Sequence, residues 1–408
     1  MNLTKHKLGE LVEVTRGMSL SGQYYAEEGE FIRLTLGNFN MNGGGFKENT
    51  SKTDLYFTGS VKDEFILKKG DIITPLTEQS VGLLGTTACI PESGRYIQSQ
   101  DVALVRCKEG RIDSNFCYYL ISSKLVRQQL SAAAQQTKIR HTSPDKIMDC
   151  TVWIPNLENQ IKIGRILTDI DNKIALNRQI NDNLEKMAKQ LYDYWFVQFD
   201  FPDENGRPYK SSGGEMVWNE KLKREIPKDW NYKTIKDFMR IFTGKKDVSK
   251  AIPGDYKFFS CAPEPITSNE YIYDGYVVLI SGNGSYTGRV GFYKGKFDLY
   301  QRTYACVLDE KPYDISFFYY TLKYLFQPIY SGGKHGSSIP YIVIGDLADF
   351  KFAFQEKVYS LFVNVVRPMF DEQLLRQREI EALTKRRDKL LPLLMNGQVS
   401  LNYHLSDD

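Results

Sequence analysis

The sequence predicts an α+β protein with an internal repeat. We expect two similar α/β domains separated by two long antiparallel helices that form a coiled coil. Three observations support this fold class: an aromatic stretch occurs once in each half, other segments recur in the same order, and each half ends in a long heptad pattern. Paired helices of this kind would relate the halves by a pseudo-two-fold axis.

The aromatic stretch is SNFCYYLISSKL, which begins at Ser114 and returns as ISFFYYTLKYLF from Ile315, 201 residues later. LGELVEVTRG, from Leu8, corresponds to IKDFMRIFTG, from Ile235, and KIMDCTVWI corresponds to DLADFKFAF. The offset falls along the chain, so the first half holds about twenty-five extra residues before Gln100, which we expect in loops. A collinear series of matches argues against chance similarity.

The globular halves mix β-branched or aromatic runs, such as GYVVLIS from Gly275, with helical stretches such as FCYYLISSKLVRQQL. This mixture indicates α+β domains with a twisted sheet. The glycine-rich stretch SGNGSYTGRVGFYKGK, from Ser281 to Lys296, lacks P-loop spacing and is interpreted as a hairpin.

Residues 163–195 and 362–394 carry seam positions spaced alternately by four and three residues. Such a sustained 3.5-residue repeat predicts a coiled coil, with polar residues in mid-seam that fix register. Pro368 implies that the second helix kinks or begins there. The predicted seam and partner-docking residues are Ile170, Ile174, Asn177, Asn181, Leu184, Leu191, Tyr194 and Trp195 in the first helix and Met369, Ile380, Leu383, Leu390 and Leu394 in the second.

We therefore expect a first domain, a central helix, a connector, a second domain and a C-terminal helix, at residues 1–155, 156–198, 199–230, 231–355 and 356–400. The connector is rich in Gly, Pro, Ser and charged residues, which predicts a segment packed on the surface. The first seam would form a rod of about 50 Å at 1.5 Å per residue.

Composition sets further limits. No run approaches eighteen apolar residues and the N-terminus is polar, so we expect no membrane span, no signal peptide and a cytoplasmic location. The six cysteines form no CxxC pair, which favours reduced thiols over zinc or disulfides. A net charge of +3 neither demands nor excludes a polyanionic partner.

Charge distribution is more informative than net charge. No acidic residue lies between Asp113 and Asp145, nor between Asp314 and Asp346. Aromatic helices that merely lack acids would explain one such window, but two windows in register favour a phosphate-facing surface in each domain.

Each window contains a small, polar, basic stretch suited to hold phosphate or read base edges. The two stretches differ in sequence, as expected of two readers of different targets, although ordinary surface loops are the alternative for any single residue. The candidate DNA-binding residues are Gln136, Thr137, Lys138, Arg140 and His141 in the first half and Lys334, His335, Ser337 and Ser338 in the second, with Arg289, Thr77 and Gln79 as weaker candidates.

Catalytic motifs are missing. The sequence has no Walker A, HExxH, GxSxG or GxGxxG motif and no amino-methyltransferase box, and its four histidines are dispersed. We therefore expect no catalytic residue, metal or cofactor in this chain.

The segment from Asn177 to Trp230, which begins NRQINDNLEKMAKQLYDYWFVQFDFPDENGRPYK, resembles the central region of the specificity subunits of type I restriction–modification systems. LTKRRDKLLPLLMNGQVS, from Leu383, resembles the C-terminal region of that family, and with the repeats the resemblance covers nearly the whole chain.

The resemblance implies a non-catalytic subunit. Each globular half would be a target-recognition domain for one half of a bipartite, asymmetric DNA site. The helices would set the gap and dock two methyltransferase subunits, which two restriction subunits can join. S-adenosylmethionine, ATP and Mg²⁺ would be used by those partners. The aromatic end of the first helix (Tyr192, Tyr194, Trp195, Phe196) is a docking patch or packs against the second domain.

Two other classes of function stay open from the residues. One is a single-chain DNA methyltransferase or nuclease with a fused recognition module, which would be active with S-adenosylmethionine alone. The other is a coiled-coil adaptor that does not bind DNA, for which replacing Lys138 and Arg140 by alanine would leave DNA affinity and its salt dependence unchanged.

Overall fold

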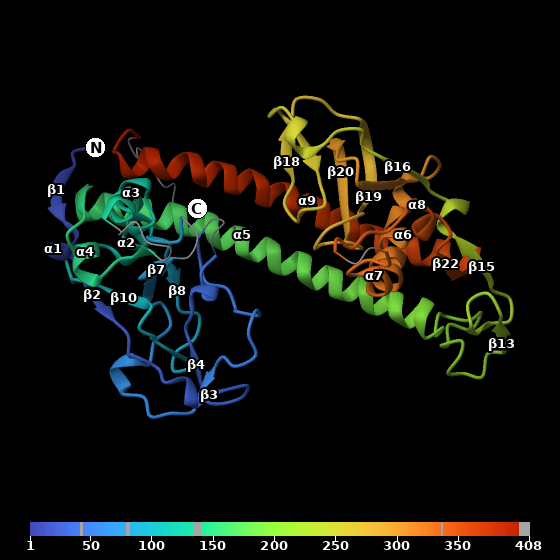
Figure 1. The fold of residues 1–408 in the computed structure, drawn as a ribbon, viewed down its shortest axis with the longest axis horizontal. Helices are drawn as coiled ribbons and strands as arrows, with labels where there is room; N and C mark the ends of the chain where they lie inside the picture. The colour runs from blue at the N-terminus through green and yellow to red at the C-terminus, as the bar shows by residue number, and fades with distance from the viewer. Residues whose placement is uncertain (41–43, 79–81, 134–139, 336–337, 400–408) are drawn as a thin grey trace. The chain divides into compact units, whose positions relative to one another are not determined.

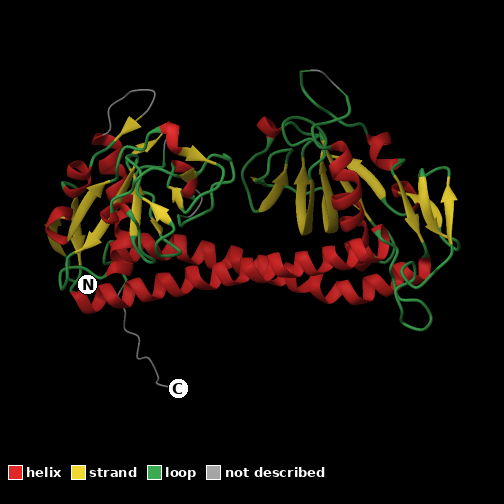
Figure 2. Ribbon diagram, turned by 90° about the horizontal axis from the view of Figure 1, so that it is seen from below, coloured by secondary structure: helices red, strands yellow, loops and turns green. Residues whose placement is uncertain are grey.

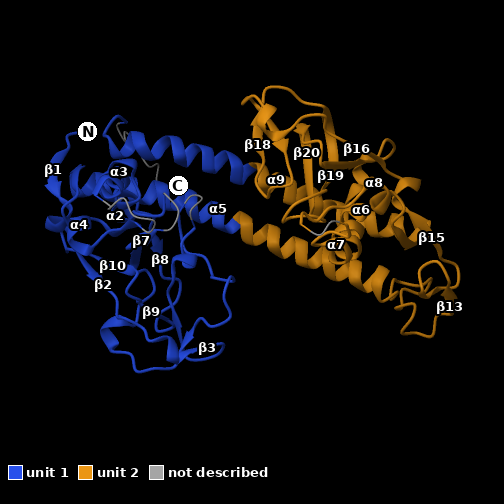
Figure 3. Cartoon of the chain, viewed as in Figure 1, with its two compact units in different colours: residues 1–176, 379–408 blue, residues 177–378 orange. Residues whose placement is uncertain are grey.

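The computed structural model describes residues 1–40, 44–78, 82–133, 140–335 and 338–399. The chain divides into two compact units: residues 1–176 with the C-terminal segment from residue 379, and residues 177–378 (Figure 3). We call them the first and second unit. Each contains a globular domain and part of both long helices.

The first unit is built on an antiparallel sheet in the order β2-β10-β6-β8 (Figure 1). Alternate residues of its strands enter different cores, Val14 and Val105 on one face and Ile73 and Leu104 on the other. Both faces are therefore buried. The strands are β2 (Val12–Arg16), β6 (Ile72–Pro75), β8 (Ala88–Cys89) and β10 (Val102–Cys107).

Helices cover one face of this sheet. The Asp113 carboxylate accepts the backbone N–H of Phe116 at 2.9 Å and thereby caps α2. The stretch FCYYLISSKLVRQQL, expected to be helical, forms two helices, the first of which ends at Ile121. The helices are α1 (Leu8–Leu11), α2 (Ser114–Ile121), α3 (Lys124–Ala133) and α4 (Pro144–Met148), and β1 (Thr4–Lys7) pairs with β12 (Thr151–Ile154).

The extra residues of the first half lie mainly in residues 34–55, which correspond to residues 260–265 of the second half. The described residues of this stretch form no strand of two or more residues, as expected of a loop insertion. The first unit also contains a second small sheet, in the order β3-β5-β4-β9. Its strands are β3 (Tyr25–Ala26), β4 (Phe31–Arg33), β5 (Tyr56–Phe57) and β9 (Tyr96–Ile97). The parallel pair β4 with β9 and the antiparallel pair β4 with β5 recur in the second unit as Tyr256–Phe259 with Val290–Leu299 and with Ile266–Ser268. This small sheet therefore belongs to the repeat.

The second unit repeats the first topology, with the sheet order β16-β21-β19-β20-β17-β18. The registers correspond: Val14 faces Val105 in the first unit, and Ile241 faces Cys306 in the second. The predicted internal repeat and the predicted hairpin are confirmed. The strands are β16 (Arg240–Thr243), β17 (Tyr256–Phe259), β18 (Ile266–Ser268), β19 (Tyr273–Ser281), β20 (Val290–Leu299) and β21 (Thr303–Val307).

Glycine pairs in the repeat have a steric cause. A Cβ at Gly17 would overlap the carbonyl oxygens of Gln98 and Ser99, and one at Gly244 would overlap the carbonyl of Leu299. Each glycine directly follows the end of a strand, β2 or β16, and lies against the backbone of a neighbouring segment, so only glycine fits there.

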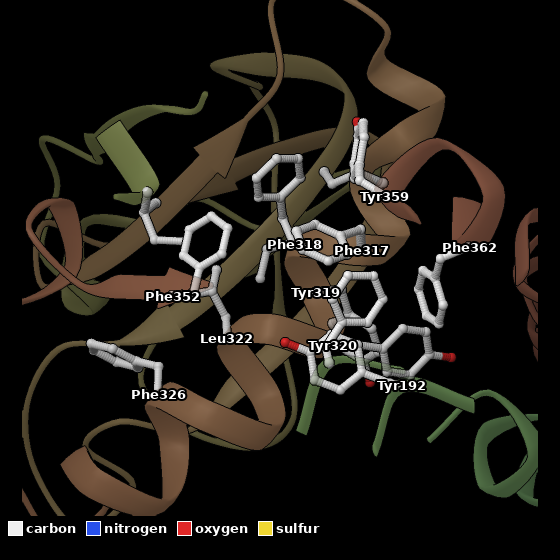
Figure 4. Close-up of a cluster of buried hydrophobic side chains, with 14 of the residues drawn as sticks. Tyr192, Phe317, Phe318, Tyr319, Tyr320, Leu322, Phe326, Phe352, Tyr359 and Phe362 are labelled. Atoms are coloured by element: carbon white, nitrogen blue, oxygen red, sulfur yellow. The ribbon is translucent and has the colours of Figure 1, made fainter. Parts of the chain in front are cut away.

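The second unit has an aromatic core (Figure 4). Every residue of α6 (Ile315–Thr321) is buried, and Phe317 and Tyr320 pack against Tyr192 of the long helix. The remaining elements of this domain are a π-helical segment (Leu322–Phe326), α7 (Gln327–Tyr330), α8 (Ile344–Ala348), and β15 (Asn231–Thr234) paired with β22 (Lys351–Phe354).

The two long helices are α5 (Leu157–Tyr192) and α9 (Glu356–Met395) (Figure 2). Within each unit their segments are antiparallel, since residues later in α5 contact residues earlier in α9. In the first unit, Asp171 pairs with Arg387 at 2.8 Å. In the second unit, the Gln373 side chain donates to the Asn181 carbonyl at 3.2 Å, so the predicted polar mid-seam exists. Pro368 lies inside α9, so the helix does not begin there.

The segment expected as a surface connector contributes to the core of the second unit. It contains the hairpin β13 (Met216–Asn219) and β14 (Arg224–Pro227). Phe199, Phe201 and Trp230 are buried, with ring centroids of Phe199 and Trp230 5.3 Å apart. Its polar composition concealed these three aromatic anchors.

Candidate nucleic-acid interface

In the first unit, two separately predicted segments meet. The backbone N–H of Thr142 donates to the carbonyl of Leu76 at 2.8 Å. Strand β7 (Thr77–Glu78) then pairs with β11 (Arg140–His141), so Thr77 faces His141 and Glu78 faces Arg140. We call the described residues of 76–87 and 140–142 the first loop surface.

The second unit joins the corresponding segments in the same way. The N–H of Ile342 donates to the Gly282 carbonyl at 3.0 Å, the counterpart of the bond between Thr142 and Leu76. The N–H of Gly284 donates to the carbonyl of Pro340 at 3.0 Å. We call residues 282–289 and the described residues of 330–342 the second loop surface.

A buried carboxylate lies at the centre of the first loop surface. The Glu78 side chain is 1% exposed, and its Oε2 accepts the backbone N–H groups of Gly82, Leu83 and Leu84 at 2.8–3.0 Å. Its Oε1 lies 3.0 Å from Nη1 of Arg140. Charge and hydrogen-bonding capacity of the carboxylate are therefore satisfied by the two segments that it joins.

Basic side chains border this carboxylate. The Arg127 guanidinium donates to the Gly82 carbonyl, and Arg140 donates to the Ser131 hydroxyl at 2.9 Å. A cavity of about 330 Å³ opens between α3 and the loop. Its lining residues are Glu78, Gly82, Leu84, Ser122, Lys124, Arg127, Gln128 and Ser131.

Asp346 organises cations of the second loop surface. Its carboxylate lies 3.0 Å from the His335 ring and 3.5 Å from the Lys334 ammonium, and it accepts the N–H of Val343. Burial pushes the pKa of Asp346 up, but the Val343 bond and the His335 and Lys334 side chains bring it below its ordinary value. The two predicted DNA-contacting residues thus share one anion.

Arg289 differs from the other predicted cations. Its Nη2 donates to the Ala262 carbonyl at 2.6 Å, and its guanidinium lies 5.7 Å from the Tyr286 ring centroid. Its Nε is buried without a hydrogen-bond partner among the described residues, and burial lowers its pKa. Arg289 therefore has donor capacity to offer an incoming acceptor.

The remaining candidates are placed as follows. Thr77 is buried, whereas His141 and Ser338 are exposed. Five predicted residues lie outside the described part of the chain: Gln79, Gln136, Thr137, Lys138 and Ser337. The structure brings Thr77, Arg140 and His141 together in the first unit, and Lys334, His335 and Arg289 belong to the second loop surface.

Sequence reasoning did not select Glu78, Arg127 or Asp346 as site residues, although Arg127 lies in the first acid-free window. A signal for Glu78 existed, because it is the only acidic residue between Asp71 and Glu92 and lies inside a candidate stretch. Asp346 had been used only to mark the end of an acid-free window.

The predicted seam residues mostly face inward. A π-helical segment, Asp193–Val197, continues α5. In it Trp195 and Phe196 are buried and Tyr194 is 38% exposed, which agrees with packing against the second domain. Other apolar side chains of the long helices are exposed in the described structure: Leu157, Ile161, Leu176, Met187, Leu361, Val365, Leu375 and Leu393.

Across the described ranges, no helix is both long and apolar enough to span a membrane. The same residues contain no group of three or more His, Cys, Asp or Glu side chains that could hold a metal ion.

Comparison with known proteins identifies the family. The model of the type I restriction modification DNA specificity domain matches residues 2–186 and 227–354, well over half of the chain. The MjaIX specificity subunit of Methanocaldococcus jannaschii is 26% identical over 323 residues, 72% of this chain and 70% of that protein. The EcoDI specificity subunit of Escherichia coli is 31% identical over 182 residues, 43% and 40% of the two chains.

A solved structure shows the same fold. The crystal structure of the S subunit of a type I restriction–modification system from M. genitalium has a TM-score of 0.62 at 18% identity and covers 97% of this chain and 96% of its own. The chain belongs to the family of type I restriction–modification DNA specificity proteins.

Proposed function

We propose that this chain is the DNA-specificity subunit of a type I restriction–modification complex and recognises a bipartite, asymmetric site. Each unit reads one half-site through its loop surface. The observation that carries this proposal is that both units join the same two segments on the same scaffold, while the side chains presented there differ. Two unlike surfaces on like frameworks suit two unlike half-sites.

The long helices set the gap between half-sites in this proposal. Helix α5 has 36 residues, about 54 Å at 1.5 Å per residue. DNA advances about 34–36 Å per turn, so such a helix is comparable to roughly one and a half turns. Its polar seam, with Gln373 bonded to Asn181, fixes one register of the pair.

Double-stranded DNA is one partner and two methyltransferase subunits are the others, and two restriction subunits can join this complex. The exposed apolar residues of α5 and α9, among them Met187 and Leu375, offer contact area for protein partners. The chain itself is non-catalytic, and S-adenosylmethionine, ATP and Mg²⁺ are used by the partner subunits. The complex works in the cytoplasm.

Genome-wide mapping of methylated adenines tests the proposal. A host that expresses this chain with its methyltransferase should acquire one bipartite, asymmetric motif. A continuous motif, or no new methylation, would overturn it. Methylation by the purified chain with S-adenosylmethionine alone would favour the single-chain enzyme. Absence of salt-dependent DNA binding by the chain would favour the adaptor.

A further inference from the structure

We propose that Glu78 is a positioning residue for sequence recognition: its ion pair with Arg140 fixes the first loop surface and hence the specificity of one half-site. This inference rests on the proposed function. Neither residue needs to touch a base for this role. Arg140, which the sequence suggested as a DNA contact, acts instead from within the protein.

The geometry of Glu78 supports this role. One carboxylate oxygen holds three consecutive backbone N–H groups, from Gly82 to Leu84, and the other faces Arg140 at 3.0 Å. With 1% of its side chain exposed, the carboxylate has little water to replace a lost partner. A fully satisfied buried network of this kind favours one loop conformation over alternatives.

Arg140 extends the constraint to a third segment. It lies opposite Glu78 in the two-residue ladder between β7 and β11. Its guanidinium also bonds to Ser131 on α3, and Arg127 of the same helix bonds to the Gly82 carbonyl. Residues 82–84, the strand β11 and helix α3 are thus tied together by charged side chains.

The second unit provides an internal comparison. The matched bonds from Thr142 to Leu76 and from Ile342 to Gly282 make Gly284 the counterpart of Glu78. There the Thr287 hydroxyl lies 2.7 Å from the Gly284 carbonyl and 2.9 Å from that of Pro340. The neutral Thr287 hydroxyl thus joins the two segments of the second loop surface, as the ion pair of Glu78 and Arg140 joins those of the first.

The experiment measures methylation motifs with the chain assembled with its methyltransferase. Glu78→Gln keeps the side-chain size, but it loses the charge and directs an NH₂ donor toward other donors. We expect one half-site to become degenerate, with discrimination reduced roughly tenfold or more, while the other half-site stays unchanged. Thr287→Val should relax the opposite half-site.

Double substitution separates positioning from simple loss of structure. Arg140→Met should relax the same half-site as Glu78→Gln. In the combined variant, the loss of discrimination at that half-site should be smaller than the sum of the two single losses, because no unpaired charge remains. Glu92→Gln is the control, since the Glu92 side chain is 59% exposed and forms a surface ion pair with Arg95.

The outcomes are distinct. Three results would each overturn the inference. Glu78→Gln could leave the discrimination at both half-sites unchanged, the losses of discrimination in the double variant could be additive, or both half-sites could relax equally. If thermal melting shows that Glu78→Gln is unfolded, the double variant decides the matter, and its failure to restore one half-site counts against the inference. Absence of any bipartite motif with the unmodified chain would instead refute the proposed function.

Discussion

Replacing Glu185 by alanine should destabilise the second unit. Glu185 lies on α5, and its Oε1 binds the Lys323 ammonium at 2.6 Å and the Tyr324 hydroxyl at 2.7 Å. Its Oε2 accepts from Gln373 of α9 at 3.2 Å. One carboxylate therefore links both long helices to the aromatic domain of this unit.

The loss of unfolding free energy can be estimated from the partners of Glu185 that the alanine leaves unpaired, chiefly the Lys323 ammonium. Breaking a fully buried ion pair costs about 3–5 kcal/mol. The side chains of Lys323 and Glu185 are 28% and 22% exposed, so water compensates in part and we expect about 2 kcal/mol. For a unit of this size, about 2–4 °C per kcal/mol converts this loss to roughly 4–8 °C in Tm.

Calorimetry of the intact chain at pH 7 measures this shift, with Glu158→Gln as the control. Glu158 lies on the same helix, but its side chain is 73% exposed and pairs with Lys162 at the surface. The Tm of Glu158→Gln should therefore match that of the unmodified protein. Equal Tm values for Glu185→Ala and the unmodified chain would refute the reasoning.

The same residue gives a pH dependence. Burial raises the pKa of Glu185, but Lys323 and the hydrogen bonds from Lys323, Tyr324 and Gln373 hold it below the ordinary 4.5. A depressed carboxylate stabilises the fold above its unfolded pKa and loses that contribution as pH falls through the folded pKa. The stability advantage over Glu185→Gln should therefore be full at pH 7 and shrink progressively below pH 4.5. A constant difference throughout acid titration would contradict the assignment.

Three further predictions concern stability and spacing. Arg387→Ala removes the 2.8 Å bond to Asp171 and should lower the free energy of unfolding of the first unit by about 1–3 kcal/mol, measured by urea denaturation; an unchanged midpoint would contradict it. Gly244→Ala forces a Cβ onto the Leu299 carbonyl and should destabilise by about 1–3 kcal/mol. The control Gly345→Ala meets nothing within 4 Å, and equal Tm losses in the two variants would count against the steric argument. Insertion of one heptad into each long helix should widen the recognised gap by one to about three base pairs, since seven residues add about 10.5 Å; an unchanged gap in methylation mapping would rule out the helices as the spacer.

The repeat and the helices could be predicted from the sequence because their signals are periodic or collinear. Heptad spacing is visible without knowledge of contacts, and aromatic stretches such as that from Ser114 are long enough to align. The small sheet of the first half was harder, since β3, β4 and β5 are only two or three residues long and lack a clear alternation. Phe199 and Trp230 were concealed by the polar residues between them.

The candidate site could be predicted only in pieces. The bond between Thr142 and Leu76 joins residues far apart in sequence, and only the path of the sheet brings them together. Arg140 illustrates the limit: a basic residue in an acid-free window suggests a phosphate contact, but its partner Glu78 lies outside that window. The residue type of Arg140 predicted its positive charge, whereas the path of the chain determined that this charge pairs with the Glu78 carboxylate.

Framework and loops are held by separate interactions, which explains how one fold can serve two targets. The sheet is fixed by side chains buried on both faces, and the register of Val14 with Val105 returns as Ile241 with Cys306. The loops are held by local bonds that differ between units, an ion pair at Glu78 and a hydroxyl at Thr287. Because changes in those local bonds leave the buried sheet contacts intact, either loop surface can diverge without loss of its scaffold or alteration of the other unit.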